Sequence, residues 1–205
     1  MQPSSADSIH KVAVFDFDGT SIGGQSGALF TRYLPYRQGE ARELVIGALR
    51  GRSSEEIDAI MERFHDEVLA PRYRDQALAE VRRCHEDGLV VLLVSATFEP
   101  IAKVAARTMG MDGFAATKMQ RDESGRYTGQ VDGPVVAGEE KYRAVVAWCD
   151  ERFGPGAWVL EAAYADHHSD SDLLSHARHA YAVCPGKTLA VSAHRNGWPI
   201  LDWDD

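Results

Sequence analysis

The feature that most constrains the fold is an uninterrupted apolar run, LVVLLVS, at residues 89–95. As a strand, this run is apolar on both faces, and such strands occur in parallel sheets that helices cover on each side. Lys11–Phe17 is a similar run, short and rich in Val and Phe, and two more follow at Val159–Ala165 and Ala180–Cys184. The sequence therefore predicts an α/β protein with a mainly parallel sheet.

Helical patterns separate these strands. The best is Ser53–Phe64, where Ser53 and Glu56 form a capping-box pattern and apolar residues then recur at helical spacing. Further helices are expected over 76–85, 99–109, 139–153 and 173–179, a short strand over 115–118, and a hairpin over 121–131. Strands that alternate with helices in this way are typical of a doubly covered parallel sheet.

The stretch between the first two strands is too long to be one crossover helix. We interpret residues 21–88 as a small helical cap domain inserted after the first strand. Residues 1–20 and 89–205 then form the core domain that contains the sheet. The predicted fold is thus a Rossmann-like, three-layer parallel sheet core with this cap over it.

Polar residues end three of the apolar runs. Asp16 and Asp18 follow the first, Ser95 ends the second and Asp166 follows the third, while Lys141 stands near the start of the helix before the third. Ligands of open parallel sheets bind outside the carboxyl ends of the strands. Clustered carboxylates raise one another's pKa and are costly to bury without a partner. We therefore expect a divalent cation there. A site with few protein ligands, completed by water and substrate phosphate, is typical of Mg²⁺.

This group of residues suits phosphoryl transfer. An i, i+2 spacing in a strand puts Asp16 and Asp18 on the same side. One carboxylate can attack phosphorus and form an aspartyl phosphate, and the other can protonate the leaving oxygen and later activate water. Lys141 and Ser95 can bind the remaining phosphate oxygens, and a metal ion lets an acidic site hold an anion.

The same residues carry a resemblance to a known family. DFDGT at 16–20, LVSAT at 93–97, GEEK at 138–141 and YADHHSDSDLL at 164–174 match, in order, the four motifs of the haloacid dehalogenase-like hydrolase superfamily. The segments GRYTG at 125–129 and GWPILDW at 197–203 are most similar to its phosphoserine-phosphatase-like branch. A lone DxD is weak evidence, but four ordered motifs that span nearly the whole chain are specific.

The resemblance implies a Mg²⁺-dependent phosphatase that hydrolyses a small phosphomonoester metabolite through an aspartyl phosphate. Asp16 would be the nucleophile and Asp18 the general acid/base, with Ser95 and Lys141 completing the catalytic set. The expected metal ligands are Asp16, Asp18 through its backbone carbonyl, Asp166 and Asp170. The expected substrate-binding residues are Thr20, Gln25, Ser95 and Lys141.

Two positions depart from the family's pattern. Gln25 stands where members that cleave phosphoserine carry a Glu that meets the substrate ammonium. An amide lacks that charge, so we do not expect L-phosphoserine to be preferred. His167 and His168 follow Asp166 where Ser is common. Neighbouring side chains do not both reach one ion easily, so we interpret this pair as loop residues.

Alternatives stay open for several residues and for the activity. Ser95 and Asp170 could be helix N-caps, and Lys141 could be a solvated helix residue. The same aspartyl phosphate would also serve a phosphotransferase or mutase. A phosphoacceptor signalling module gathers similar residues, but such modules are shorter, carry their acids on different strands and have no place for the insert.

Charge and composition bear on partners and location. The formal net charge of −9 argues against broad attraction to nucleic acid or an anionic membrane. The longest apolar run, 89–94, is too short to span a bilayer, and the N-terminal residues lack a signal-peptide pattern. Three separated cysteines fit reduced thiols, so we expect a cytoplasmic protein. The sequence does not indicate the oligomeric state, and both a monomer and a homodimer stay open.

Overall fold

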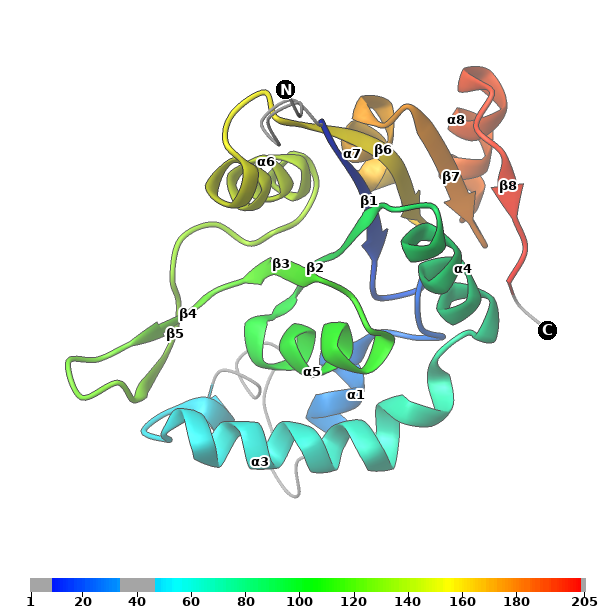
Figure 1. Ribbon diagram of the computed structural model, residues 1–205. Coiled ribbons are helices and arrows are strands. Elements are labelled where there is room, and N and C mark those ends of the chain that lie inside the picture. The colour runs from blue at the N-terminus through cyan, green and yellow to red at the C-terminus, as the bar shows by residue number, and fades with distance from the viewer. Residues whose placement is uncertain (1–8, 34–46, 204–205) are drawn as a thin grey trace.

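The computed structural model describes residues 9–33 and 47–203. Its centre is a six-stranded sheet in the order β3-β2-β1-β6-β7-β8, and every neighbouring pair is parallel (Figure 1). The strands are β1 (His10–Asp16), β2 (Val90–Phe98), β3 (Gly113–Thr117), β6 (Trp158–Ala165), β7 (His179–Val183) and β8 (Ile200–Leu201). The α/β class and the parallel sheet predicted from the apolar runs are confirmed.

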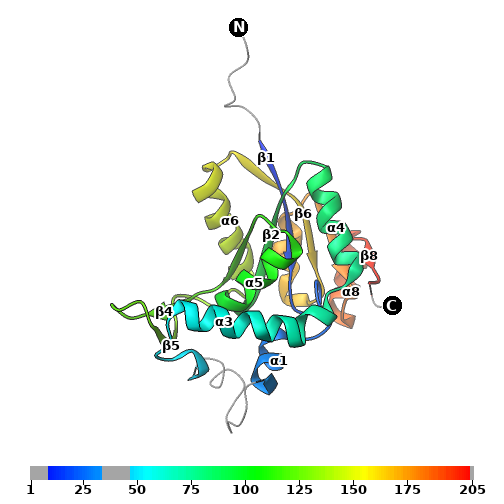
Figure 2. The same ribbon diagram turned by 60° about the horizontal axis from the view of Figure 1, so that its bottom comes forward.

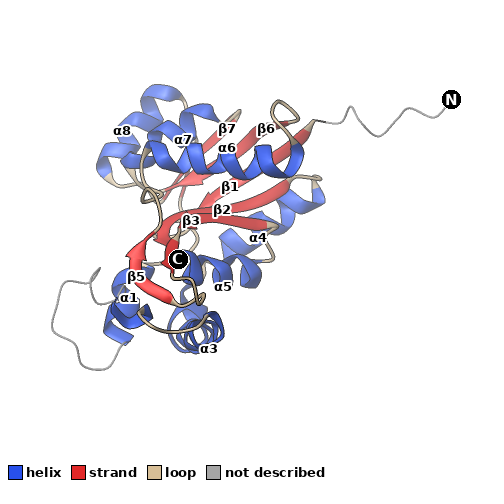
Figure 3. Ribbon diagram, turned by 90° about the vertical axis from the view of Figure 1, so that its left-hand side faces the viewer, coloured by secondary structure: helices blue, strands red, loops and turns tan. Residues whose placement is uncertain are grey.

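Helices cover both faces of the sheet, which completes three layers (Figure 3). One face packs against α4 (Asp75–Glu86) and α5 (Glu99–Met109), with Phe15, Leu93 and Tyr164 in the shared core. The other face packs against α6 (Glu139–Phe153), α7 (Ser171–His176) and α8 (Lys187–Asn196). Successive strand residues point to opposite faces, so runs without polar alternation fill both cores.

Two helices lie beyond the carboxyl end of β1 rather than on a face of the sheet (Figure 2). They are α1 (Ser26–Tyr33) and α3 (Ser54–Phe64), and the π-helical turn η1 (His65–Leu69) and the 3₁₀ turn η2 (Ala70–Arg72) follow α3. The predicted capping box is confirmed, because Ser53 and Glu56 each accept a backbone N–H from the other.

The cap range 21–88 stays a prediction as a domain, and its residues 34–46 lie outside the described residues. Within that range, α1 and α3 stand over the carboxyl end of the sheet, whereas α4 packs on the sheet itself. Ala77, Val81 and Cys84 of α4 are fully buried in the core shared with β2. A division by packing would therefore count α4 with the core.

A two-stranded antiparallel hairpin of β4 (Met119–Arg121) and β5 (Tyr127–Val131) projects from the sheet, which confirms the hairpin predicted over 121–131 with its turn at 123–126. It meets the chain just before α3, where Gly51 donates its N–H to the Tyr127 carbonyl at 2.7 Å. No helix in the described part of the chain is long and apolar enough to cross a membrane.

Some boundaries differ from those predicted. β2 continues past Ser95 to Phe98, because β3 pairs with it on both sides of a register shift. The helix expected over 173–179 is α7, which ends at His176, and His179 already belongs to β7. The helix α8 and the strand β8 were not predicted. Pro185-Gly186 was interpreted only as the end of the last predicted strand, and no helix or strand was predicted after it.

Candidate active site

The carboxyl edge of the sheet holds a cavity of about 340 Å³. The parallel register of three neighbouring strands brings its residues together. Asp16 ends β1, Ser95 lies in β2 on one side of it, and Asp166 directly follows β6 on the other side. The lining residues are Asp16, Asp18, Gln25, Ser95, Ala96, Ala137, Lys141, Asp166, His167, Ser169 and Asp170. Among the site residues predicted from sequence, Thr20 is missing from this lining.

Lys141 is the positive centre of the site. It is the third residue of α6, only 5% exposed, and its Nζ donates to Asp16 Oδ1 at 2.6 Å and to Asp170 Oδ2 at 2.8 Å. Burial by itself would lower the pKa of Lys141, but the charges of Asp16 and Asp170 outweigh it and raise this pKa. The alternative that Lys141 is a solvated helix residue is therefore wrong.

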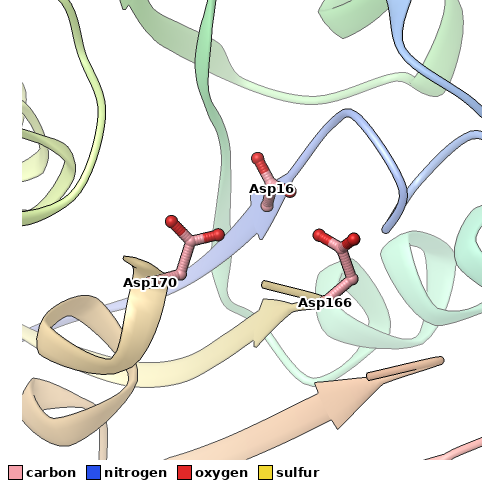
Figure 4. A group of neighbouring side chains, drawn as sticks. All are labelled: Asp16, Asp166 and Asp170. Atoms are coloured by element: carbon pink, nitrogen blue, oxygen red, sulfur yellow. The ribbon is translucent and has the colours of Figure 1, made fainter. Parts of the chain in front are cut away.

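Three carboxylates point toward one another from β1 and from the segment after β6 (Figure 4). Oxygen atoms of Asp16, Asp166 and Asp170 all lie within 4.8 Å of one another. Burial, and then the charge of Asp16, raise the pKa of Asp166 to about 7 and also raise that of Asp170. Protonation or a bound cation would relieve this repulsion, so the donor set fits a hard divalent ion.

Asp170 uses its side chain here rather than as a helix cap. It directly precedes α7, but its carboxylate makes no capping hydrogen bond to that helix. One of its oxygens faces Lys141, and the other accepts from the Ser169 hydroxyl at 3.3 Å. Asp170 is thus the N-cap residue of α7 by position, as the alternative held, but its side chain contacts Lys141 and Ser169 rather than the helix.

Gly19 makes room for the acids. Its φ is +85°, a region that L side chains rarely adopt. A Cβ at this position would lie 2.2 Å from Asp166 Oδ2, well inside van der Waals contact. The backbone turn after β1 thus passes against Asp166, and only a residue without a side chain fits this approach.

Asp18 is half-buried and faces a different partner from Asp16. Its Oδ1 accepts the backbone N–H of Ser26 at 2.6 Å, and its Oδ2 accepts the Ser26 hydroxyl at 3.1 Å. Burial raises the pKa of Asp18 to about 6, against the opposing effect of the Ser26 backbone hydrogen bond. A carboxyl with such a pKa can hold a proton near neutral pH, as a general acid must.

Ser95 is 1% exposed and lies inside β2. Its Oγ accepts the backbone N–H of Thr97 at 3.1 Å. The N-cap position of the following helix α5 is Phe98, three residues further on, so the N-cap alternative for Ser95 is wrong. Ser95 lines the same cavity as Asp16 and Lys141.

Two expected substrate contacts lie in different settings. Gln25 is exposed and borders the cavity, where a substrate can reach it. Thr20 is fully buried, and its hydroxyl lies 3.1 Å from Asp16 Oδ2 and 3.2 Å from Asp166 Oδ1. A buried hydroxyl that spans two acids cannot touch substrate, so Thr20 instead holds these carboxylates in place.

The histidine pair is exposed, as expected for loop residues. His167 borders the cavity, and its Nδ1 accepts the backbone N–H of Ser169 at 3.3 Å. His168 begins the short 3₁₀ turn η3 (His168–Asp170) that carries Asp170 to the site. Neither ring belongs to the carboxylate cluster that the described residues form.

Sequence reasoning missed two residues at this site, Ser26 and Thr97. Both are buried, and their hydroxyl oxygens lie 2.9 Å apart. Serine and threonine have no distinctive spacing in a glycine-rich loop or beside a strand end. Their pairing across 71 positions of the chain is visible only in the folded structure.

A larger cavity, of about 480 Å³, lies between β3 and α6. It is lined by Phe114, Val136 and Trp148 together with surface charges, and none of the candidate catalytic residues reaches it. Size alone therefore does not identify the reactive site, whereas the convergence of acids and Lys141 does.

Comparison with known proteins agrees with this geometry. A family model described as haloacid dehalogenase-like hydrolase matches residues 13–175, which include every acid of the site and Lys141. Phosphoserine phosphatase SerB1 of Mycobacterium tuberculosis (strain ATCC 25618 / H37Rv) is 28% identical over 221 residues, which cover 93% of this chain and 70% of that protein.

Two further proteins are similar along most of their length. Histidinol-phosphatase of Neisseria meningitidis serogroup C (strain 8013) is 26% identical over 220 residues, which cover 94% of this chain and 98% of that protein. The crystal structure of a protein of unknown function from Bordetella pertussis Tohama I superposes with a TM-score of 0.84 at 24% identity, over 96% of this chain and 100% of that one. The last likeness supports the fold alone.

Proposed function

The chain belongs to the haloacid dehalogenase-like hydrolases, in their phosphoserine-phosphatase-like branch, and from this we propose a Mg²⁺-dependent phosphatase that hydrolyses a small phosphomonoester metabolite. The observation that carries the proposal is the meeting of Asp16, Asp18 and Lys141 with two further acids at one cavity. These residues come from three separate segments, namely the end of β1, the start of α6 and the stretch after β6, and a structural role for the fold does not require acids to converge.

In the proposed first step, a carboxylate oxygen of Asp16 attacks phosphorus and the bond from phosphorus to the leaving oxygen breaks. Asp18 gives its proton to that oxygen, so the alcohol leaves uncharged. In the second step Asp18 takes a proton from water, the water oxygen attacks phosphorus, and the bond to Asp16 breaks. Inorganic phosphate is released and both carboxyl groups return to their starting states.

Asp16, Asp166, Asp170 and the backbone carbonyl of Asp18 would hold Mg²⁺. The Asp18 carboxylate itself is held by Ser26, which leaves its carbonyl as the donor to the ion. When bound, Mg²⁺ would offset carboxylate charge and stabilise the charge on the transferring phosphoryl group. Lys141 supplies a second positive charge, and Ser95 a hydroxyl donor, for the phosphate oxygens.

The identity of the metabolite rests on the rim of the cavity. Gln25 is uncharged, so it cannot pair with a substrate ammonium as a carboxylate would, and we do not expect L-phosphoserine to be preferred. The similar proteins named above carry two different substrates in their names. The proposal therefore names the class of small phosphomonoesters and no single metabolite. Location in the cytoplasm, and a monomer or a homodimer as the oligomeric state, stay predictions.

The proposed activity is tested with a panel of phosphorylated metabolites and p-nitrophenyl phosphate, assayed with Mg²⁺ and with an excess of chelator. We expect release of inorganic phosphate that needs Mg²⁺, with phosphoserine below the best substrate. Added acceptor alcohols separate the alternative: phosphate recovered mainly as a new ester would indicate a phosphotransferase. No turnover of any compound on the panel would contradict the proposal.

Metal binding can be measured without turnover. Mg²⁺ at about 100 times its Kd is expected to stabilise the protein by about 2.7 kcal/mol, seen as a higher melting temperature. Because protons compete for Asp166, whose pKa is about 7, the increase should be larger at pH 8 than at pH 6.

The variant Asp166→Asn should lose most of this increase, whereas the control Asp132→Asn, an exposed loop residue, should keep it. An equal Mg²⁺ response in wild type and Asp166→Asn would show that the ion binds elsewhere. The readout is differential scanning fluorimetry of the purified proteins over a Mg²⁺ titration.

A further inference from the structure

A chain of hydrogen bonds runs behind the cavity and joins Asp18 to Ser95. The Ser26 hydroxyl lies 3.1 Å from Asp18 Oδ2 and 2.9 Å from the Thr97 hydroxyl. The Thr97 backbone N–H in turn lies 3.1 Å from Ser95 Oγ. Ser26 is fully buried and Thr97 is 6% exposed, and neither lines the cavity, so both touch the reactive groups without facing a substrate.

The chemistry of these groups sets the direction of each bond. The Ser26 hydroxyl donates to Asp18 Oδ2, an oxygen that keeps a lone pair for this bond both when Asp18 is ionised and when it carries the proton for the leaving oxygen. The Ser26 oxygen then accepts the hydroxyl proton of Thr97. Ser95 receives the Thr97 amide on its oxygen, and its own proton finds no acceptor among the described residues. That proton is left for a group in the cavity, such as a phosphate oxygen.

We propose that Ser26 and Thr97 are positioning residues that hold the proton donor Asp18 in register with the phosphate site at Ser95. The inference rests on the proposed function, because it takes Asp18 as the group that protonates the leaving oxygen. Asp18 lies in the turn after β1, and Ser26 is the first residue of α1. Thr97 belongs to β2, so the pair ties the acid to the central sheet.

A role in positioning the proton donor has a specific signature. Loss of the Ser26 hydroxyl should harm substrates that need protonation of the leaving oxygen and spare those that do not. Phenyl phosphate releases a weakly acidic phenol and needs the proton. p-Nitrophenyl phosphate has almost the same shape but releases a much better leaving group. The value of kcat/KM reports steps up to transfer of the phosphoryl group to Asp16, the stage at which this proton is used.

The experiment measures kcat/KM on both aryl phosphates with Mg²⁺ for wild type, Ser26→Ala, Ser26→Thr and Thr97→Val. For Ser26→Ala we expect a loss of about 10–100-fold on phenyl phosphate and of less than about 3-fold on p-nitrophenyl phosphate. Ser26→Thr keeps the hydroxyl and should recover most of the loss. Thr31→Ala, which removes an exposed hydroxyl from the same helix, is the matched control.

Thr97→Val should give the same selective loss, because it keeps the hydrogen bond from the Thr97 backbone N–H to Ser95 Oγ and removes only the hydroxyl next to Ser26. If Thr97 acts through Ser26, the double variant Ser26→Ala, Thr97→Val should be no worse than Ser26→Ala alone. Melting curves establish that each variant folds. Should Ser26→Ala fail to fold, the selective loss in Thr97→Val and its rescue in Thr97→Ser decide the matter.

Equal losses on the two aryl phosphates would assign Ser26 a purely structural role and overturn the inference. Additive losses in the double variant would likewise show that Thr97 does not act through Ser26. A wild-type protein inactive on both compounds and on the metabolite panel would instead overturn the proposed function. The two failures are therefore distinguishable.

Discussion

Replacement of Asp16 by Asn is expected to lower phosphomonoester hydrolysis by about 10⁴-fold or more, because a carboxamide cannot serve as the attacking oxygen. The substitution keeps the size of the side chain. The carbonyl oxygen of the new amide can still accept from Lys141 Nζ, which lies 2.6 Å from Asp16 Oδ1 in the wild type. We therefore expect a folded protein without activity. The measurements are phosphate release with Mg²⁺ and circular dichroism of the same preparation.

A second readout follows the covalent step itself. Wild-type protein quenched in acid during turnover should carry a phosphoryl group on the peptide that contains Asp16, and Asp16→Asn should not. The control Asp132→Asn removes a carboxylate charge from an exposed loop and should stay within about twofold of wild type. Near-normal activity in Asp16→Asn would overturn the assignment of the nucleophile. A phosphorylated wild type that never turns over would favour the signalling-module alternative.

Replacement of Gly19 by Ala is expected to cost about 100-fold or more in activity through a shift of about 1 Å in Asp166. The new Cβ would lie 2.2 Å from Asp166 Oδ2 and 2.7 Å from its Cγ, so that carboxylate must swing away from Asp16 and Asp170. The backbone cost, for a non-glycine residue at φ +85°, should be about 1–2 kcal/mol. Activity, Mg²⁺-induced stabilisation and urea unfolding measure the three effects.

Gly88→Ala is the matched control for the backbone term. Gly88 has a φ of +76°, and a Cβ there would meet nothing within 4 Å. Both variants should lose similar stability, but only Gly19→Ala should lose activity and the response to Mg²⁺. If the two variants behave alike in all three measurements, the close approach of Gly19 to Asp166 has no part in the metal site.

The candidate site was predicted from sequence to the extent that motifs mark strand ends. Asp16 ends β1 and Asp166 follows β6, whereas Ser95 lies inside β2, next to Val94, which pairs with Asp16. That these strands are neighbours was an assumption of the sequence reasoning, and the pairing of β1 with β2 and β6 confirms it. Lys141 illustrates the limit. Its position early in a helix predicted a phosphate contact, but its ion pairs with Asp16 and Asp170 depend on how α6 and η3 pack against the sheet.

Thr20 shows where sequence reasoning went wrong. Thr20 ends the DFDGT motif, and the family resemblance implied that it binds substrate. The turn after β1 instead carries its hydroxyl back beneath Asp16 and Asp166, where no solvent reaches it. Ser26 and Thr97 show the converse, since nothing in their spacing indicated that they would meet.

By itself the sequence determined the sheet, its helical cover and the acids at its edge, because apolar runs without polar alternation have to be buried on both faces. Only the tertiary structure decided which hydroxyl holds which carboxylate and how deeply Lys141 is buried. Hydrogen bonds and ion pairs act over a few ångströms between segments far apart in the chain, and local residue patterns carry no record of those distances.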